Sequence, residues 1–321
     1  MPTGVTGKTT FRDQGTHESN ANLVLADDVL DLADSALENS EFDLWLVLDR
    51  LDIAFAEDEE LERNALRALF RVYLDLQSLK HLSLKIFLRN DIWQRSFGEG
   101  MRESSHITRH TTITWGKQSL LNLVVRRALH NDSLRTYYEV DKATILQDFR
   151  EQSRLFYRIY PDQVDLGSRK SETFDWMMSR TKDGSGHTAP RELIHLLSSA
   201  RDVQLQKLAV GSADIAGEAL FDRVSLKEAL PEVSQVRFRQ TLCAEYPSLQ
   251  EWLYKLEGEK TQQSASTLAK IWDVDEARAL QVAGKLTEVG FFERKGSKED
   301  PVFRVPFLYR DALQMVQGPA T

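Results

Sequence analysis

The chain has 321 residues, of which 41% are hydrophobic and 28% charged, a composition typical of a globular chain with two or three domains. Its formal charge of −8 argues against non-specific nucleic-acid binding by the whole surface, and its single cysteine, Cys243, excludes an intrachain disulfide. The sequence shows no signal peptide and no apolar run long enough to span a bilayer, so we expect a cytoplasmic protein with no membrane partner.

The first 24 residues are predicted to form a disordered arm, because residues 10–22 are polar and rich in Gly, Ser, Asn and charge. Gly7-Lys8-Thr9 matches the end of the phosphate-binding motif GxxxxGK[ST], but the first glycine would fall on Pro2. Only six residues precede Gly7, and no apolar helix follows it. We therefore interpret this match as chance and expect the phosphate loop and its leading strand to be missing from this chain.

Residues 42–52, FDLWLVLDRLD, run from an apolar stretch into Asp49 and Asp52. A continuous apolar run bounded by charge predicts a strand that is buried on both faces of a parallel sheet. Carboxylates at the C-terminal end of such a strand lie where open α/β sheets bind ligands. The alternative interpretation is that both aspartates cap the loop and the following helix.

The next segments predict a β-α-β unit with polar residues at both strand tips. Residues 58–77 have apolar positions at helical spacing, and residues 82–88, LSLKIFL, read as a second buried strand. Arg89 and Asn90 follow this strand directly. Because the strands of a β-α-β unit are parallel, these residues should share an edge of the sheet with Asp49.

The region after the second strand is locally basic and contains Arg109 ahead of a strand-like segment, residues 111–115. Residues 117–131 have a dense apolar pattern that predicts a helix packed on the sheet. Beyond residue 132 the pattern predicts helices without strands, over residues 149–160, 171–180 and 190–208. Residues 182–187, KDGSGH, predict a turn. Thr188 and Pro190 are signals for the start of the third helix, which carries Arg191 in its first turn.

The last hundred residues predict a separate domain. Residues 233–246 form a helix in which Cys243 is a buried structural thiol. Helices over 264–272 and 276–289, followed by a hairpin ending at Val305, resemble a winged-helix domain. The second of these helices balances Arg278 and Lys285 against two glutamates, which is a weak footprint for DNA reading.

The order WLVLDRLD, KIFLRNDIW, ITWGKQSLLNLVVRRAL and TAPRELIHLLSSA resembles the STAND-like, AAA+-related P-loop ATPases of prokaryotes, many of which are encoded among bacterial defence genes. The resemblance implies that Asp49 is the Walker B acid that holds Mg²⁺ with ATP, and that Asn90 or Arg89 is a sensor of the γ-phosphate. It also implies that Arg109 is an arginine finger and Arg191 a "sensor 2" arginine. The alternatives are a solvated basic face for Arg109 and an ion pair with a neighbouring acid for Arg191.

The expected fold class is α/β: an incomplete P-loop NTPase-type parallel sheet, a helical lid and a C-terminal winged-helix domain. The expected boundaries are an arm (1–24), a partial ATPase core (25–131), a lid (132–215), and a helical linker with the winged helix (216–321). In hydrolysing members of the resembled class, the residue after the Walker B acid is usually a second acid that orients the attacking water, but here it is Arg50. Arg50 cannot act as a base, so Asp52 would have to take that role. This favours slow switching between nucleotide states over rapid hydrolysis.

Three functions remain open from the sequence. The first is a nucleotide-dependent switch module, inactive or slow alone, which self-associates or needs a partner that supplies the P-loop. The second is a degenerate, non-catalytic interaction protein with the same fold. The third is a winged-helix regulator that binds DNA, which the charge pattern supports weakly.

Overall fold

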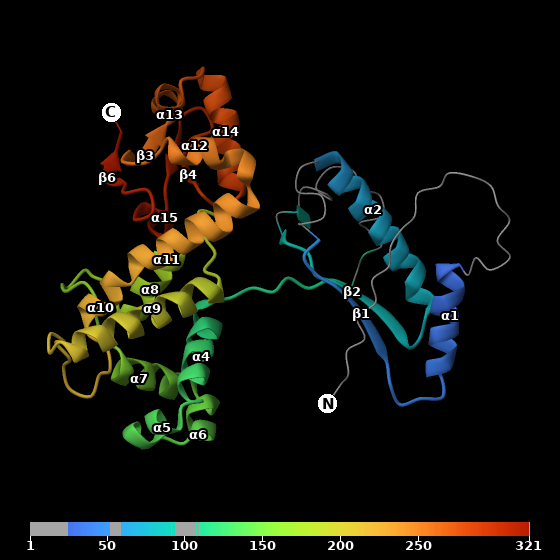
Figure 1. Cartoon of the computed structure of the whole chain (residues 1–321), viewed down its shortest axis with the longest axis horizontal. Coiled ribbons are helices and arrows are strands. Elements are labelled where there is room, and N and C mark those ends of the chain that lie inside the picture. The colour runs from blue at the N-terminus through green and yellow to red at the C-terminus, as the bar shows by residue number, and fades with distance from the viewer. Residues whose placement is uncertain (1–24, 52–58, 91, 94–106, 108, 321) are drawn as a thin grey trace. The chain divides into compact units, whose positions relative to one another are not determined.

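The computed structural model describes residues 25–51, 59–90, 92–93, 107 and 109–320 (Figure 1). Asp52 therefore lies outside the described residues, as does the arm expected over 1–24. The chain is mixed α/β and divides into two compact units, Met1–Thr108 and Arg109–Thr321.

The first unit contains a parallel β-α-β arrangement. Helix α1 (Ala26–Leu37) precedes strand β1 (Leu44–Leu48), helix α2 (Glu59–Asp75), a 3₁₀ turn (Leu76–Ser78) and strand β2 (Leu82–Ile86). The two strands are parallel, with Leu44 opposite Leu82 and Leu48 opposite Ile86. The predicted strands and the helix that connects them are thus confirmed.

The two faces of this small sheet differ. On one face, Ile86 and Leu88 pack with Phe70 of α2, and Leu82 and Leu84 are buried. On the opposite face Trp45 is 64% exposed and Val47 is 55% exposed. The prediction that the first strand is buried on both faces is therefore wrong, because α2 packs on one face and the described residues leave Trp45 and Val47 exposed on the other.

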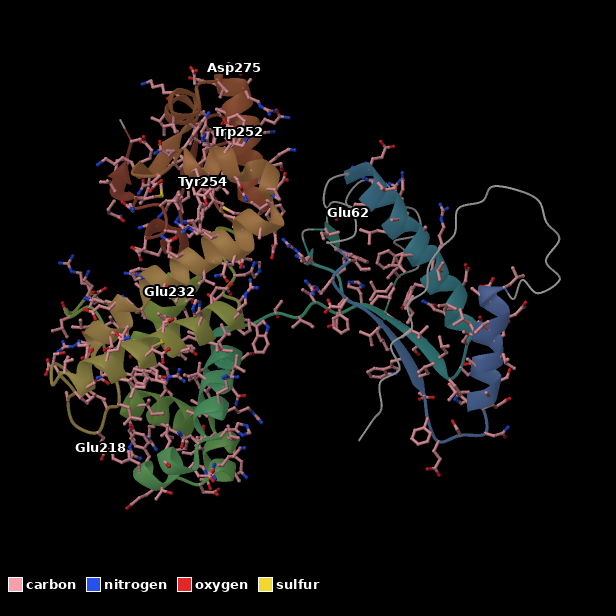
Figure 2. The ribbon with its side chains drawn as sticks, viewed as in Figure 1. Glu62, Glu218, Glu232, Trp252, Tyr254 and Asp275 are labelled. Atoms are coloured by element: carbon pink, nitrogen blue, oxygen red, sulfur yellow. The ribbon has the colours of Figure 1, made fainter. Side chains whose placement is uncertain are left out.

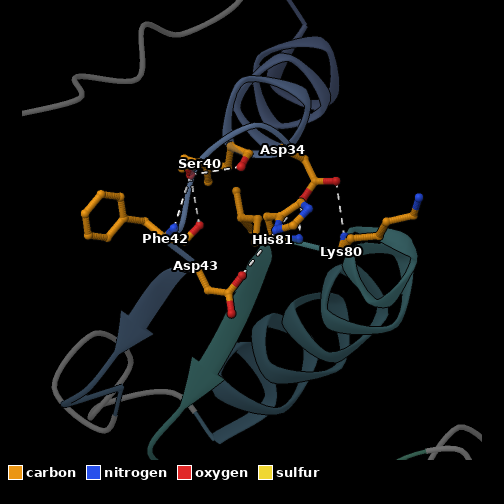
Figure 3. A network of polar contacts seen from close by, with 8 residues as sticks. Asp34, Ser40, Phe42, Asp43, Lys80 and His81 are labelled. Carbon is orange, nitrogen blue, oxygen red and sulfur yellow. Dashed lines mark hydrogen bonds and ion pairs between the residues drawn. The ribbon is translucent and has the colours of Figure 1, made fainter.

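Helix α1 is attached to the N-terminal end of β2 by one carboxylate (Figure 3). Asp34 Oδ1 accepts hydrogen bonds from the backbone N–H groups of His81, at 2.7 Å, and Leu82, at 3.0 Å. Its other oxygen accepts from the Lys80 N–H at 3.2 Å. His81 Nδ1 also lies 3.2 Å from Asp43 Oδ1. These contacts hold the N-terminal ends of β1 and β2, whereas Asp49 lies at the C-terminal end of β1.

The second unit begins with residues 109–116, which form no regular structure. The prediction of a strand over residues 111–115 is therefore wrong. Its Thr, Ile and Trp residues are common in strands, but among the described residues this segment pairs with no other strand. The helices that follow are α4 (Lys117–Ala128), α5 (Asp132–Tyr138), α6 (Lys142–Gln147), α7 (Phe149–Ile159), α8 (Thr173–Thr181), α9 (Pro190–Ala209), α10 (Arg223–Glu228) and α11 (Leu230–Val236).

Helix α4 packs on α7 and α9 rather than on a sheet, which corrects the expected packing of residues 117–131. Its buried stripe, Leu120, Leu121, Val124 and Val125, belongs to the core of the second unit. An apolar stripe shows that a helix is covered on one side but does not identify the covering element.

The C-terminal part of this unit begins after a π-helix (Arg237–Cys243), a 3₁₀ turn (Pro247–Leu249) and α12 (Gln250–Tyr254). Its elements are β3 (Lys260–Ser264), α13 (Ala265–Trp272), α14 (Glu276–Glu288), β4 (Glu293–Gly296), β5 (Pro301–Arg304), α15 (Phe307–Arg310) and β6 (Val316–Pro319). The strand order is β4-β5-β3-β6. The predicted pair of helices and the hairpin after them are confirmed, and Cys243 is buried as expected.

One hydrophobic core runs through the second unit, from Leu120 to Leu313. The C-terminal elements thus share a core, and one compact unit, with the helices before them. The Gly184 N–H donates to Gly290 O at 2.7 Å, and the guanidinium carbons of Arg180 and Arg310 lie 3.7 Å and 3.9 Å from the Phe307 ring centroid. Among the described residues, no helix has the length and apolar character needed to cross a bilayer.

Candidate functional site

The C-terminal end of β1 presents Asp49 to solvent. Its Oδ1 accepts a hydrogen bond from the backbone N–H of Arg50 at 2.8 Å. Arg50 has a φ of 58°, a left-handed conformation that is uncommon for a residue with a side chain. The chain therefore turns sharply at the strand tip, and the carboxylate is held beside the turn.

The C-terminal end of β2 lies beside the C-terminal end of β1, because the two strands are parallel. The Phe87 N–H donates to Leu48 O at 2.8 Å, which extends the parallel ladder one residue beyond β2. Arg89 and the exposed Asn90 follow within the same connection, and the Trp93 N–H donates to Arg89 O at 2.9 Å. The structure thus places Asp49, Arg89 and Asn90 at the same end of the sheet, where the C-terminal ends of its two strands lie, as the parallel pairing requires.

The residues that follow the two strands at this end of the sheet carry a carboxylate, an amide and a guanidinium. Mg²⁺ prefers a few carboxylate oxygens completed by water and phosphate oxygens, so Asp49 fits as a single protein ligand to Mg²⁺ bound with a phosphate. The described residues contain no group of three or more His, Cys, Asp or Glu side chains that could hold a metal by themselves. This end of the sheet could therefore contribute to a metal-nucleotide site but does not form a closed metal centre.

Two predicted site residues belong to the second unit. Arg109 is exposed in the irregular segment before α4. Arg191 lies in the first turn of α9, with its side chain 64% exposed and its Nε 3.3 Å from Glu192 Oε1. Pro190 opens this helix as predicted, but Thr188 is not its cap. Thr188 Oγ1 instead donates to Met178 O at 3.2 Å.

A buried ion pair beside Arg191 was not predicted. Glu192 is 3% exposed, and its Oε1 also lies 3.1 Å from Nη1 of Arg237 on the π-helix. Burial opposes the charge on Arg237, but the neighbouring Tyr309 and Glu192 raise the pKa of this guanidinium above its ordinary value. Burial also raises the pKa of Tyr309. The pair joins α9 to the π-helix beside α15, and its partners are too far apart in sequence to be found by local patterns.

Comparisons of the chain with protein families, with curated proteins and with solved structures find no match.

Proposed function

We propose that the chain is part of a nucleotide-responsive ATPase of the P-loop type, in which it supplies the metal-binding acid and the γ-phosphate sensor. The observation that supports this is the parallel β1-α2-β2 unit with Asp49 after one strand and Arg89 and Asn90 after the other. In open α/β sheets, ligands bind at this edge. On this proposal another polypeptide segment supplies the phosphate cradle and its lysine, because the sequence contains no GxxxxGK[ST] motif.

On this proposal Asp49 orients Mg²⁺ while Asn90 or Arg89 contacts the γ-phosphate. Arg50, a permanent cation, cannot take a proton from the attacking water. The complete site should therefore switch slowly between nucleotide states and turn over poorly. Arg109 as an arginine finger and Arg191 as a phosphate sensor belong to the same proposal.

The C-terminal section would act as a winged helix that relays the nucleotide state. Its helices share one core with the lid helices, and Gly184 lies against the turn after α14. The buried pair of Glu192 and Arg237 joins the Arg191 turn to the π-helix. A change at Arg191 would therefore act directly on a buried charge pair.

A spectroscopic metal titration tests the acid. Mn²⁺, replacing Mg²⁺, is added with ATP to the isotope-labelled full chain, and amide signals are followed by NMR. We expect broadening centred on Asp49 and Phe87, and its loss in Asp49→Asn. Asp43→Asn is the matched control, because Asp43 is an exposed acid at the other end of β1.

Asp49→Asn should leave the melting temperature of the metal-free chain unchanged or slightly raised, since asparagine can still accept the Arg50 N–H. Strong destabilisation would instead make Asp49 a structural cap. Calorimetric titration of the chain with Mg-ATP should detect weak binding or none. This agrees with the expected broadening, because Mn²⁺ broadens amide signals at a much lower occupancy of the site than calorimetry can detect. Micromolar affinity would contradict a missing phosphate cradle.

A DNA-binding regulator is the second candidate, because α13, α14 and the β4-β5 hairpin have the order of a DNA-reading winged helix. The exposed Arg278 is already engaged: its Nη1 donates to Gln281 at 2.6 Å, and its guanidinium lies 5.7 Å from the ring of Trp252, which Figure 2 labels. A mobility-shift assay at low salt separates the candidates, since a DNA reader would bind duplex DNA and lose affinity in Arg278→Ala.

A further inference from the structure

Strand β1 exposes apolar side chains that a parallel strand ordinarily buries. Such strands are ordinarily buried on both faces, yet Trp45 and Val47, which lie on the same face of this five-residue strand, are exposed. Phe87, directly after β2, is 49% exposed as well. Several exposed apolar side chains on two neighbouring strands are typical of interaction surfaces on folded proteins.

The backbone of β1 is also available for pairing on one side. In the parallel ladder, Leu44 donates to His81 O at 2.7 Å and Leu48 accepts from Phe87 at 2.8 Å. Because backbone directions alternate along a strand, Trp45 and Val47 direct their N–H and C=O groups away from β2. Among the described residues β1 pairs with β2 alone, so this side of β1 is an edge that can accept a further strand.

Two acidic side chains lie at the ends of this edge. Asp43 and Asp49 flank β1 directly and are exposed. Basic side chains are present as well: Arg50 follows Asp49, and Lys85 Nζ of β2 lies 4.9 Å from the centroid of the Trp45 ring. An added strand with apolar side chains in its middle and basic side chains at its ends would complement the exposed Trp45 and Val47 and the acids at the two ends of β1.

A second copy of the chain fits this edge less well. If two β1 strands paired antiparallel about Leu46, all five residues would pair, but Asp43 of each copy would lie opposite Asp49 of the other. Like charges directly opposite in a ladder are destabilising. The acids therefore act against self-pairing while they favour a basic partner.

We propose that the edge of β1 binds an extended segment of another polypeptide, which adds a strand beside Trp45 and Val47 and carries Lys or Arg at its ends. Such strand addition obtains affinity from backbone hydrogen bonds and specificity from alternate side chains. Binding requires neither ATP nor Mg²⁺, so it is measured without them. Its failure and failure of the proposed nucleotide function are therefore distinguishable.

The probe is a labelled peptide of alternating valine and threonine with two lysines at each end, followed by fluorescence anisotropy with the full chain. The key variant is Val47→Pro. It removes an N–H that points outward while sparing the hydrogen bonds of Leu46 to β2, and proline is tolerated on edge strands for this reason. Val47→Thr keeps the N–H and is the matched control.

We expect saturable binding, weakened about five- to tenfold by Val47→Pro, as for the loss of one hydrogen bond, and changed less than about twofold by Val47→Thr. Replacing the lysines of the peptide by glutamates should also weaken binding at least about tenfold. Hydrogen exchange should show new protection at the Trp45 and Val47 amides when the lysine peptide binds.

Three results would overturn the proposal. The first is equal affinity for the lysine and glutamate peptides or for Val47→Pro and the wild type. The second is slow exchange of the Trp45 and Val47 amides in the chain without peptide. The third is a dimer in sedimentation experiments that Val47→Pro dissociates, which would show that a second copy occupies the edge.

Discussion

At the residue scale, the polar side chains with the most hydrogen bonds are not those that the sequence singles out. Asp34 accepts three backbone N–H groups; desolvation opposes the ionised form, but these bonds hold the pKa of Asp34 below its ordinary value. Asp49, at a predicted site, accepts the N–H of its own neighbour. A carboxylate at a strand tip can be predicted from composition, but a carboxylate that ties two distant segments together cannot.

Asp222 provides a test of pH-dependent stability. It caps α10 through the Ser225 N–H at 2.6 Å and lies 2.9 Å from Lys207 Nζ. Desolvation acts to raise its pKa, but the Ser225 and Lys207 contacts prevail and lower it to about 2. In the unfolded chain the pKa of an aspartate is about 3.9. Because the pKa of Asp222 is lower in the folded protein, its ionised form stabilises the fold by roughly 2 kcal/mol at any pH above about 4.

We therefore expect Asp222→Asn to lower the free energy of unfolding by roughly 2 kcal/mol at pH 7, since asparagine keeps the cap but loses the charge. The difference from wild type should close as the pH falls from about 4 to about 2. Urea denaturation over this pH range measures it. Asp202→Asn, at an exposed pair with Arg201 on α9, should change stability by less than about 0.5 kcal/mol, and a pH-independent gap for Asp222→Asn would contradict the assignment.

At the scale of elements, local patterns predicted the segments well and their surroundings poorly. The apolar runs around Leu46 and Leu84 and the period of residues 58–77 predicted β1, β2 and α2, because strand and helix periods are local properties. The exposure of β1 and the packing of α4 on α7 and α9 depend on which element covers each face. Residues 111–115 show the same limit, since a strand needs a partner as well as β-branched residues.

Two glycines test close packing between elements. A Cβ on Gly184 would lie 2.4 Å from Phe292 O and 2.5 Å from Phe292 C, whereas a Cβ on Gly284 within α14 meets nothing within 4 Å. Gly184→Ala should therefore destabilise the second unit by at least about 2 kcal/mol, because backbone must shift. Gly284→Ala should stabilise it by about 0.5–1 kcal/mol through helix propensity. Denaturant midpoints measure both, and a neutral Gly184→Ala would show that the loop does not need this close approach.

At the scale of the whole molecule, the two units differ in the core that supports them. The second unit has one extended core of fully buried side chains, while in the first unit the packed cluster centres on Phe70 and Ile107 beneath two strands. A short two-stranded sheet is marginally stable without further strands or helices. The first unit is therefore the part of the chain whose stability should respond most to a partner strand.

This difference predicts two separate unfolding transitions. In differential scanning calorimetry the first unit should melt below the second, because it buries less apolar surface. Leu82 and Leu286 are both buried, at 2% and 0% exposure, and Leu→Ala in a core costs about 2–5 kcal/mol. Leu82→Ala should lower only the first transition and Leu286→Ala only the second. A single transition that both substitutions lower together would show that the two units fold as one cooperative body.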